Sequence, residues 1–273
     1  MFVETVRRVK RISRQIAKEL NISGPFNLQL LAKDNEVKVI EANVRASRTF
    51  PFSSKTLKVN FIELATKVMV GAPAPPFQIS LLDLDYVGIK APMFSFTRLV
   101  GADPVLGVEM ASTGEVATFG EDRFDAILTS MISTGFKIPK RQVFLCIGPV
   151  KAKMEFLPQV RLLLEMGLSI SCSQGTYDFY KSNDLDVNLL HKPMSNKQPN
   201  ITDAIKNDVI DLVINVRDSK ADEDSKTDGF LIRRAAVDCS VCLITDIKLA
   251  ALVVTAMSKR KALNIKAWDE FGN

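Results

Sequence analysis

The sequence predicts an α/β protein, and three observations carry the prediction. Near the N-terminus a helical pattern precedes two alternating segments joined by a short polar turn, which is typical of a helix followed by a β-hairpin. From residue 141 onward, short apolar runs alternate regularly with helical patterns. Such alternation favours an open parallel sheet with helices on both faces. The 273 residues, 47% of them hydrophobic, suffice for about two domains.

The first part of the chain mixes helices and strands without regular alternation. Apolar residues recur at helical spacing from residue 3 to residue 20, and a polar turn separates two strand-like runs after it. The expected elements are a helix at 3–20, strands at 26–33 and 37–44 around a turn at 34–36, a helix at about 60–70, a proline-rich loop at 71–76 and a helix near 122–133.

The regular part begins after a boundary expected at residues 139–141, which divides the chain into domains 1–138 and 139–273. Strands are expected near 143–147, 168–172, 186–190, 209–215 and 241–245. Helices are expected near 154–166, 176–182, 201–207, 229–237 and 246–258. The polar stretch 218–228 is expected to be a mobile surface loop.

Composition and charge exclude several classes of function. The formal charge of +5 suits anionic small molecules, and with only 7% aromatic residues no nucleic-acid partner is expected. No apolar run reaches the ~18 residues of a membrane span, so no membrane partner is expected. The four cysteines are expected to be buried, reduced thiols, which fits a cytoplasmic location. Cys239 and Cys242 form a Cys-x-x-Cys, but no second pair of zinc ligands accompanies them.

Three side chains with oxygen ligands are expected on one face of the hairpin. Glu41 and Asn43 are two positions apart, so they point to the same side of a strand. If the turn has three residues, residue 33 pairs with residue 37 and Gln29 lies directly opposite Glu41. The three side chains would then converge.

Arg45 and Arg48 come directly after these residues in the sequence, two and five positions beyond Asn43. Hard oxygen ligands suit Mg²⁺ or Mn²⁺, which share the phosphates of a bound nucleotide, and arginines hold phosphate or carboxylate oxygens. The pattern therefore indicates a phosphoryl-transfer site. The simpler alternative is an exposed hairpin with a polar face, and spacing alone leaves both open.

This part of the chain resembles ATP-grasp ligases, specifically the second synthetase half of carbamoyl-phosphate synthetase large chains. The matching residues are Gln29, Glu41, Asn43, Arg45, Arg48, Thr49, Pro51 and Phe52. Residues 87–96 and 101–116 match as well, whereas Val44 stands where the family usually has proline.

The resemblance implies a partial ATP-grasp (α+β) domain with ATP and Mg²⁺ or Mn²⁺ as cofactors. It implies Gln29, Glu41 and Asn43 as metal ligands, and Arg45 and Arg48 as catalytic residues. It also implies that the chain is a fragment whose partners are the remainder of the synthetase and a glutamine amidotransferase subunit or domain.

The second part has polar residues where strands are expected to end. The loop 172–176 offers Ser173 and Thr176 at a helix start, and Asn215 ends the strongest strand. In an open parallel sheet these strand ends meet at one edge, and a helix N-terminus favours an anion. Lys153 and Lys192 would bring positive charge there. The alternative is that Ser173 and Thr176 are only helix caps.

This part resembles the methylglyoxal-synthase-like (MGS-like) regulatory domain that ends synthetase large chains, through residues 157–163, 211–215 and 232–238. The resemblance implies effector binding by Lys153, Ser173, Thr176, Lys192 and Asn215. Residues 94–99 and 244–248 are most similar to pyrimidine-pathway synthetases. That implies a small phosphorylated effector, a uridine nucleotide or phosphoribosyl pyrophosphate, rather than N-acetylglutamate. Lyase activity is not expected, because residues 194–199 lack the Gly-Gly-Asp of methylglyoxal synthase.

The sequence therefore supports two interpretations. In the first, the chain is part of an enzyme that phosphorylates carbamate with ATP to give carbamoyl phosphate, although the chain alone is expected to be inactive. In the second, it is a stand-alone effector-binding module without catalytic activity.

Overall fold

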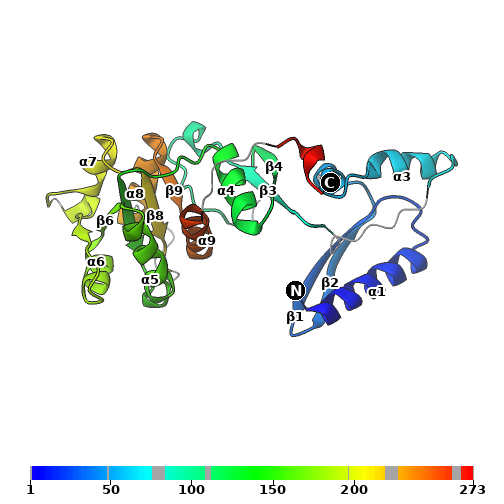
Figure 1. Ribbon diagram of the computed structural model, residues 1–273, viewed down its shortest axis with the longest axis horizontal. Helices are drawn as coiled ribbons and strands as arrows, with labels where there is room; N and C mark the ends of the chain where they lie inside the picture. The colour runs from blue at the N-terminus through cyan, green and yellow to red at the C-terminus, as the bar shows by residue number, and fades with distance from the viewer. Residues whose placement is uncertain are drawn as a thin grey trace. The chain divides into compact units, whose positions relative to one another are not determined.

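A computed structural model describes residues 2–47, 49–75, 84–107, 112–195, 197–218, 227–259 and 266–272. The chain divides into two compact units (Figure 1). The N-terminal unit contains Met1–Asp85 with Lys266–Asn273, and the sheet unit contains Tyr86–Ile265. No helix of the described residues is long and apolar enough to cross a membrane.

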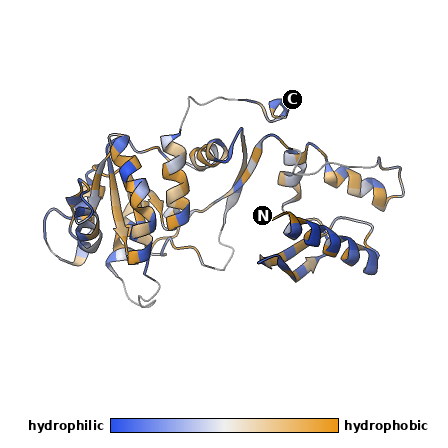
Figure 2. Ribbon diagram, turned by 60° about the horizontal axis from the view of Figure 1, so that its bottom comes forward, coloured by the Kyte–Doolittle hydropathy of each residue, from blue (hydrophilic) through white to orange (hydrophobic). Residues whose placement is uncertain are grey.

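The N-terminal unit consists of helices around a β-hairpin. Its elements are α1 (Val3–Glu19), β1 (Asn27–Lys33), β2 (Glu36–Asn43), α2 (Phe50–Leu57) and α3 (Phe61–Met69). The helix at 3–20, both hairpin strands and the helix near 60–70 are confirmed. Helix α2 was not predicted, although Pro51 lies in its first turn, where a proline costs no backbone hydrogen bond. Apolar and polar residues share the surface of α1, as the hydropathy colouring shows (Figure 2).

The hairpin turn differs from the expectation in length. Lys33 pairs with Glu36, so the turn has two residues, Asp34 and Asn35, and not three. Both have positive φ, 49° and 65°, the conformation of the tight turn that best fits twisted strands. Asp and Asn tolerate this region because their short polar side chains bond locally, and Asn35 accepts a 2.9 Å hydrogen bond from the Thr5 hydroxyl of α1.

The sheet unit contains an antiparallel pair and a parallel sheet. The strands β3 (Val87–Met93) and β4 (Gly114–Gly120) pair along their whole length, and α4 (Arg123–Ser133) packs on them. The parallel sheet has the order β7-β6-β5-β8-β9. Its strands are β5 (Gln142–Ile147), β6 (Ser169–Cys172), β7 (Asn188–Leu189), β8 (Leu212–Val216) and β9 (Cys242–Ile244). Its helices are α5 (Val150–Glu165), α6 (Gln174–Lys181), α7 (Ile201–Lys206), α8 (Asp228–Asp238) and α9 (Ile247–Ser258).

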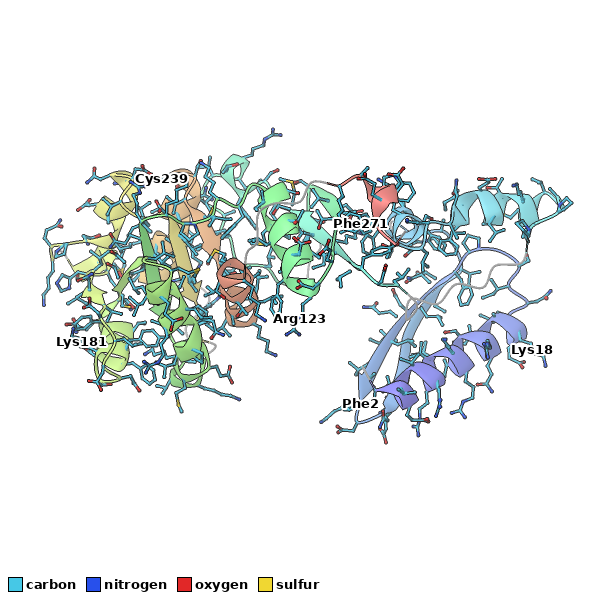
Figure 3. All side chains as sticks on the ribbon, viewed as in Figure 1. Phe2, Lys18, Arg123, Lys181, Cys239 and Phe271 are labelled. Carbon is cyan, nitrogen blue, oxygen red and sulfur yellow. The ribbon has the colours of Figure 1, made fainter. Side chains whose placement is uncertain are left out.

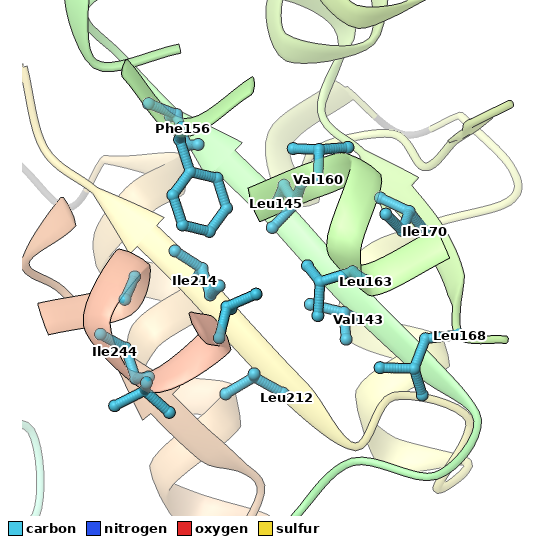
Figure 4. Packing of buried hydrophobic residues seen from close by; sticks show 14 of the residues in the cluster. Val143, Leu145, Phe156, Val160, Leu163, Leu168, Ile170, Leu212, Ile214 and Ile244 are labelled. Atoms are coloured by element: carbon cyan, nitrogen blue, oxygen red, sulfur yellow. The ribbon is translucent and has the colours of Figure 1, made fainter. Parts of the chain in front are cut away.

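Helices cover both faces of this sheet because its central strands are apolar on both sides. Val143 and Leu145 of β5 point into a core with α5 and α9, shown in Figure 4, whereas Phe144 packs with α7 and α8 on the other face. The predicted α/β class with an open parallel sheet is confirmed. Of the polar stretch 218–228, residues 219–226 lie outside the described residues, and Asp228 begins α8.

The division into units does not coincide with the expected domain boundary at 139. Helix α4 packs against α9, and both Leu128 and Phe136 belong to the main core of the sheet unit. The compact unit therefore begins at Tyr86. Whether residues 1–138 form a domain in the functional sense stays a prediction.

The cysteine expectation is partly wrong. All four thiols are free and Cys172 is buried, but Cys146 and Cys242 are half-buried and Cys239 is exposed (labelled in Figure 3). Cys239 directly follows the last residue of α8, and Ser240 after it has a positive φ of 57°. Burial raises the pKa of the Cys172 thiol, which keeps it protonated and unreactive.

Candidate functional site

A cavity of about 350 Å³ lies at the carboxyl edge of the parallel sheet. Strand β5 pairs in parallel with β6 on one side and with β8 on the other. The strand order therefore runs outward from β5 in both directions: β6 and β7 follow on one side, and β8 and β9 on the other. In open sheets this switch point leaves a crevice between the loops that follow the two strands. Here the ends of β5 and β8 and the first residues after them, 146–148 and 215–218, border the cavity.

All five effector residues expected from the sequence line this one cavity. They are Lys153 from α5, Ser173 and Thr176 from the start of α6, Lys192 from the loop after β7, and Asn215 from β8. The first and the last of these residues are more than sixty positions apart in the sequence, and the parallel strands bring them together. Arg217 lines the cavity as well, and so do Thr227, Asp228 and Arg233, to which sequence reasoning assigned no site role.

Lys153 is a buried cation beside the first turn of α6. Its side chain is 8% exposed, and Nζ donates a 2.8 Å hydrogen bond to the Gly175 carbonyl. An ammonium has three donors, so two remain for other partners. The N–H groups of Gln174 and Gly175 precede the first intrahelical bond of α6, and they favour an anion at the same place.

The Thr176 side chain connects α6 to the end of β5 by hydrogen bonds. Its Oγ1 accepts a 3.0 Å hydrogen bond from the Ile147 N–H and lies 3.2 Å from the Ile147 carbonyl, so it ties α6 to the end of β5. Ser173 is the N-cap residue of α6, yet its hydroxyl makes no capping bond and lies 3.3 Å from Thr176 Oγ1. The capping alternative therefore does not describe the Ser173 hydroxyl.

Arg233 of α8 is the most deeply placed cation of the cavity, at 3% exposed. Nη1 donates a 2.8 Å hydrogen bond to Asn215 Oδ1, while Nε and Nη2 donate to the two carboxylate oxygens of Asp103 at 2.7 and 2.5 Å. Gly229 makes room for it, because a Cβ there would lie 3.0 Å from Nη1. Two consecutive arginines, Arg233 and Arg234, inside the otherwise apolar run 230–237 are the signal that could have revealed this residue.

The cavity carries more positive than negative side chains. Lys153, Lys192, Arg217 and Arg233 line it together with Asp218 and Asp228. Asp228 accepts a 2.8 Å hydrogen bond from the Met194 N–H, and Lys192 is exposed. Excess cation, a helix start and hydroxyl groups together suit a small anion with several oxygens.

The hairpin of the N-terminal unit brings together the three expected metal ligands. Gln29 pairs with Glu41 across the two strands, as expected, and the Asn43 amide donates a 2.8 Å hydrogen bond to Glu41 Oε1. Gln29 and Glu41 are exposed, and Asn43 is half-buried. The face can therefore present several oxygens to one cation.

The residues of this face fit a cation shared with a nucleotide better than a cation held by protein alone. Glu41 is the only carboxylate among the three, and the described residues contain no group of three or more acidic, histidine or cysteine ligands. Magnesium normally takes one or two carboxylates and fills its shell with phosphate oxygens and water. Arg45 is exposed and donates to the Ala46 carbonyl at 3.2 Å, whereas Arg48 lies outside the described residues.

Residues 155–245 match the family described as MGS-like domain. The chain carries an MGS-like domain. The match spans α5 to β9 and includes most of the residues that line the cavity.

Longer relatives match nearly the whole chain. The multifunctional protein pyrABCN of Emericella nidulans is 46% identical over 274 residues, which are 97% of this chain and 12% of the relative. The multifunctional protein CAD of Squalus acanthias is 47% identical over 267 residues, 93% of this chain and 12% of the relative. Mitochondrial carbamoyl-phosphate synthase (ammonia) of Rattus norvegicus is 41% identical over 271 residues, 96% of this chain and 18% of the relative.

The chain is thus homologous to part of a carbamoyl-phosphate synthase, and it spans less than a fifth of the length of these relatives. The resemblance stated from the sequence is confirmed. The individual roles of the cavity residues in the MGS-like domain and of the hairpin residues stay predictions.

Proposed function

We propose that the MGS-like domain of this chain binds a small phosphorylated effector in the cavity at the carboxyl edge of its sheet. The observation that carries the proposal is the convergence of Lys153, Lys192, Arg217 and Arg233 on one switch-point cavity. Phosphate groups offer several charged oxygens, which suit both the ammonium groups and the guanidinium forks.

The charge of the cavity favours a polyphosphate over N-acetylglutamate. Each charge-assisted hydrogen bond contributes about 1.5–3 kcal/mol, so the loss of one should weaken binding about ten- to a hundredfold. A uridine nucleotide or phosphoribosyl pyrophosphate would engage several such contacts at once. The similarity to multifunctional pyrimidine-type relatives supports the same ligand class.

The test is calorimetry on the whole chain with uridine triphosphate, phosphoribosyl pyrophosphate and N-acetylglutamate. The whole chain is needed because α4 belongs to the core of the sheet unit. Lys192→Ala should weaken phosphate-ligand binding at least about tenfold, whereas Lys181→Ala, an exposed lysine at the end of α6, is the matched control. Binding of N-acetylglutamate alone would refute the ligand class, and affinity unchanged by Lys192→Ala and Lys153→Ala would refute the site.

A second function concerns the intact synthetase, and the hairpin favours it. There the segment would take part in ATP-dependent phosphorylation of carbamate to carbamoyl phosphate. Gln29, Glu41 and Asn43 would hold Mg²⁺ or Mn²⁺ on the ATP phosphates, and Arg45 and Arg48 would hold phosphate and carbamate. The opposition of Gln29 and Glu41 and the Asn43–Glu41 hydrogen bond support this assignment. The metal ion would supply charge neutralisation at the transferred phosphoryl group.

The proposed partners are the remaining synthetase domains and a glutamine amidotransferase subunit or domain, in the cytoplasm. The alternative is a module that senses an effector and catalyses nothing. We expect the purified chain to show no metal-dependent ATPase activity, because it resembles only a part of an ATP-grasp domain and spans less than a fifth of the length of its relatives. An ATPase rate well above background that is lost in Glu41→Gln would exclude the stand-alone module.

A further inference from the structure

Arg233 contacts both the cavity and the connection between β3 and β4. It lines the cavity and bonds Asn215 on its floor, and the same guanidinium holds Asp103 in the connection between β3 and β4. The two oxygens of the Asp103 carboxylate accept hydrogen bonds from Nε and Nη2 of Arg233, at 2.7 and 2.5 Å. Three of the five guanidinium donors are thereby in use.

Arg234 fastens the same connection without lining the cavity. Its guanidinium donates to the carbonyls of Phe96, Leu99 and Ala102 at 3.0–3.2 Å and pairs with Asp238 one turn later. Residues 96–103 are therefore docked on α8 by two neighbouring arginines. Of these two, Arg233 is the one that a ligand in the cavity can reach.

We infer that Asp103 competes with a bound anion for Arg233, so that effector binding loosens the docking of residues 96–103 on α8. The inference rests on the proposed effector function and adds a positioning residue to it. A carboxylate and a phosphate recognise the same guanidinium fork. Two anions beside one buried cation repel each other, and the low polarity around a side chain that is 3% exposed strengthens that repulsion.

The coupling must act equally in both directions. If a bound anion weakens the Asp103–Arg233 pair, then removal of the Asp103 charge must strengthen anion binding by the same factor. A purely structural Asp103 would behave differently: its loss would lower the stability of the sheet unit and leave ligand affinity unchanged. The two directions therefore provide two independent measurements.

The first measurement is the affinity of the whole chain for uridine triphosphate by calorimetry. Asp103→Asn should tighten binding about three- to tenfold, because Arg233 loses its internal anion. Asp238→Asn is the matched control: it removes one negative charge from the partner of Arg234 on the same helix, away from the cavity lining. Unchanged or weaker binding by Asp103→Asn, or equal tightening in the control, overturns the inference.

The second measurement is amide hydrogen exchange in the unmodified chain, and it decides the matter even if the variant does not fold. Arg98, Leu99 and Ala102 donate backbone hydrogen bonds within the docked segment, so their amides report its opening. Saturating uridine triphosphate should speed their exchange about threefold or more, with α4 amides unchanged. Exchange that is unchanged or slower while the ligand binds overturns this inference alone. Absence of binding by both uridine triphosphate and phosphoribosyl pyrophosphate overturns the proposed function and this inference together.

Discussion

Glu41 faces Gln29 across a β-bulge. From the turn upward the strands pair evenly until Leu30 meets Val39, and then Gln29 meets Glu41, which leaves Ile40 as an extra residue. An even ladder from the two-residue turn would have placed Ile40 opposite Gln29 and turned Glu41 to the other face. The bulge therefore assembles the proposed metal face, as bulges do beside active sites.

This relationship predicts the effect of neutralising Glu41 in an intact synthetase that carries this segment. Glu41→Gln keeps the side-chain size but removes the only carboxylate among the three proposed metal ligands, so carbamate phosphorylation should fall by at least about a hundredfold. Partial-reaction assays should show the bicarbonate-dependent step largely intact. Glu36→Gln, on the same strand beside the turn, should leave both reactions unchanged. Equal loss of both reactions in Glu41→Gln would indicate misfolding.

Ser173 and Thr176 should separate ligand binding from stability. Thr176→Val removes the acceptor of the buried Ile147 N–H and should lower the free energy of unfolding by about 1–3 kcal/mol, whereas Thr176→Ser should keep most of it. Ser173→Ala should change stability by less than about 1 kcal/mol and weaken effector binding. Urea unfolding and calorimetry measure the two effects. A Thr176→Val protein as stable as the parent would contradict the structural role.

The hairpin shows how a pattern can predict a contact for an incomplete reason. The pairing of Gln29 with Glu41 was expected from a three-residue turn, but the turn has two residues and a bulge supplies the missing one. Turn length and bulge position depend on local twist and on side-chain packing, which single-sequence patterns do not contain. The face was predictable because the side-chain period of two was visible at Glu41 and Asn43.

The cavity could be predicted only in part from the sequence. Its lysines, hydroxyls and Asn215 could be predicted because strand–helix alternation places strand ends at one edge. Arg233 could not be assigned in the same way, because its partner Asp103 is 130 residues away and precedes the parallel sheet. Long-range packing also joins α4 to α9, and the compact unit therefore begins at Tyr86. The boundary expected at residue 139 rests on the change to regular strand–helix alternation, a local pattern that does not contain this contact.

Asp211 should make the stability of the sheet unit depend on pH. Partial burial alone would raise its pKa, but hydrogen bonds from the Arg141 guanidinium and from the Lys140 and Arg141 N–H groups outweigh it and hold the pKa below its usual value. A depressed carboxyl pKa stabilises the fold above the unfolded-state pKa, and this stabilisation is lost as pH falls through the folded-state pKa.

Asp211→Asn should therefore lower the free energy of unfolding by about 1.5–3 kcal/mol at pH 7, and the difference from the parent should shrink below about pH 4. Urea unfolding at several pH values measures this. Asp208→Asn is the matched control, because that side chain is 85% exposed and bonds the same Arg141 at 3.2 Å. It should change stability by less than about 0.5 kcal/mol. An Asp211 effect independent of pH would contradict the assignment.

The contact between α4 and α9 predicts where the chain can be divided. Leu128 and Phe136 are 4% and 8% exposed within the main core, and a fragment that begins at residue 139 lacks both. Burial of one such side chain stabilises by about 1.5–3 kcal/mol, so that fragment should lose about 3–6 kcal/mol relative to one that begins at residue 86. Thermal and urea unfolding of the two fragments measure the difference.

The point variant Leu128→Ala in the whole chain controls for damage caused by cutting, and it should cost about 2–5 kcal/mol. A fragment from residue 139 that is as stable as the longer one would show that α4 only rests on the sheet unit. In that case the division at residue 139 would be the better description. If both the fragment and Leu128→Ala lose a large part of the free energy of unfolding, α4 belongs to the unit that holds the effector cavity. One core then stabilises both α4 and the parallel sheet.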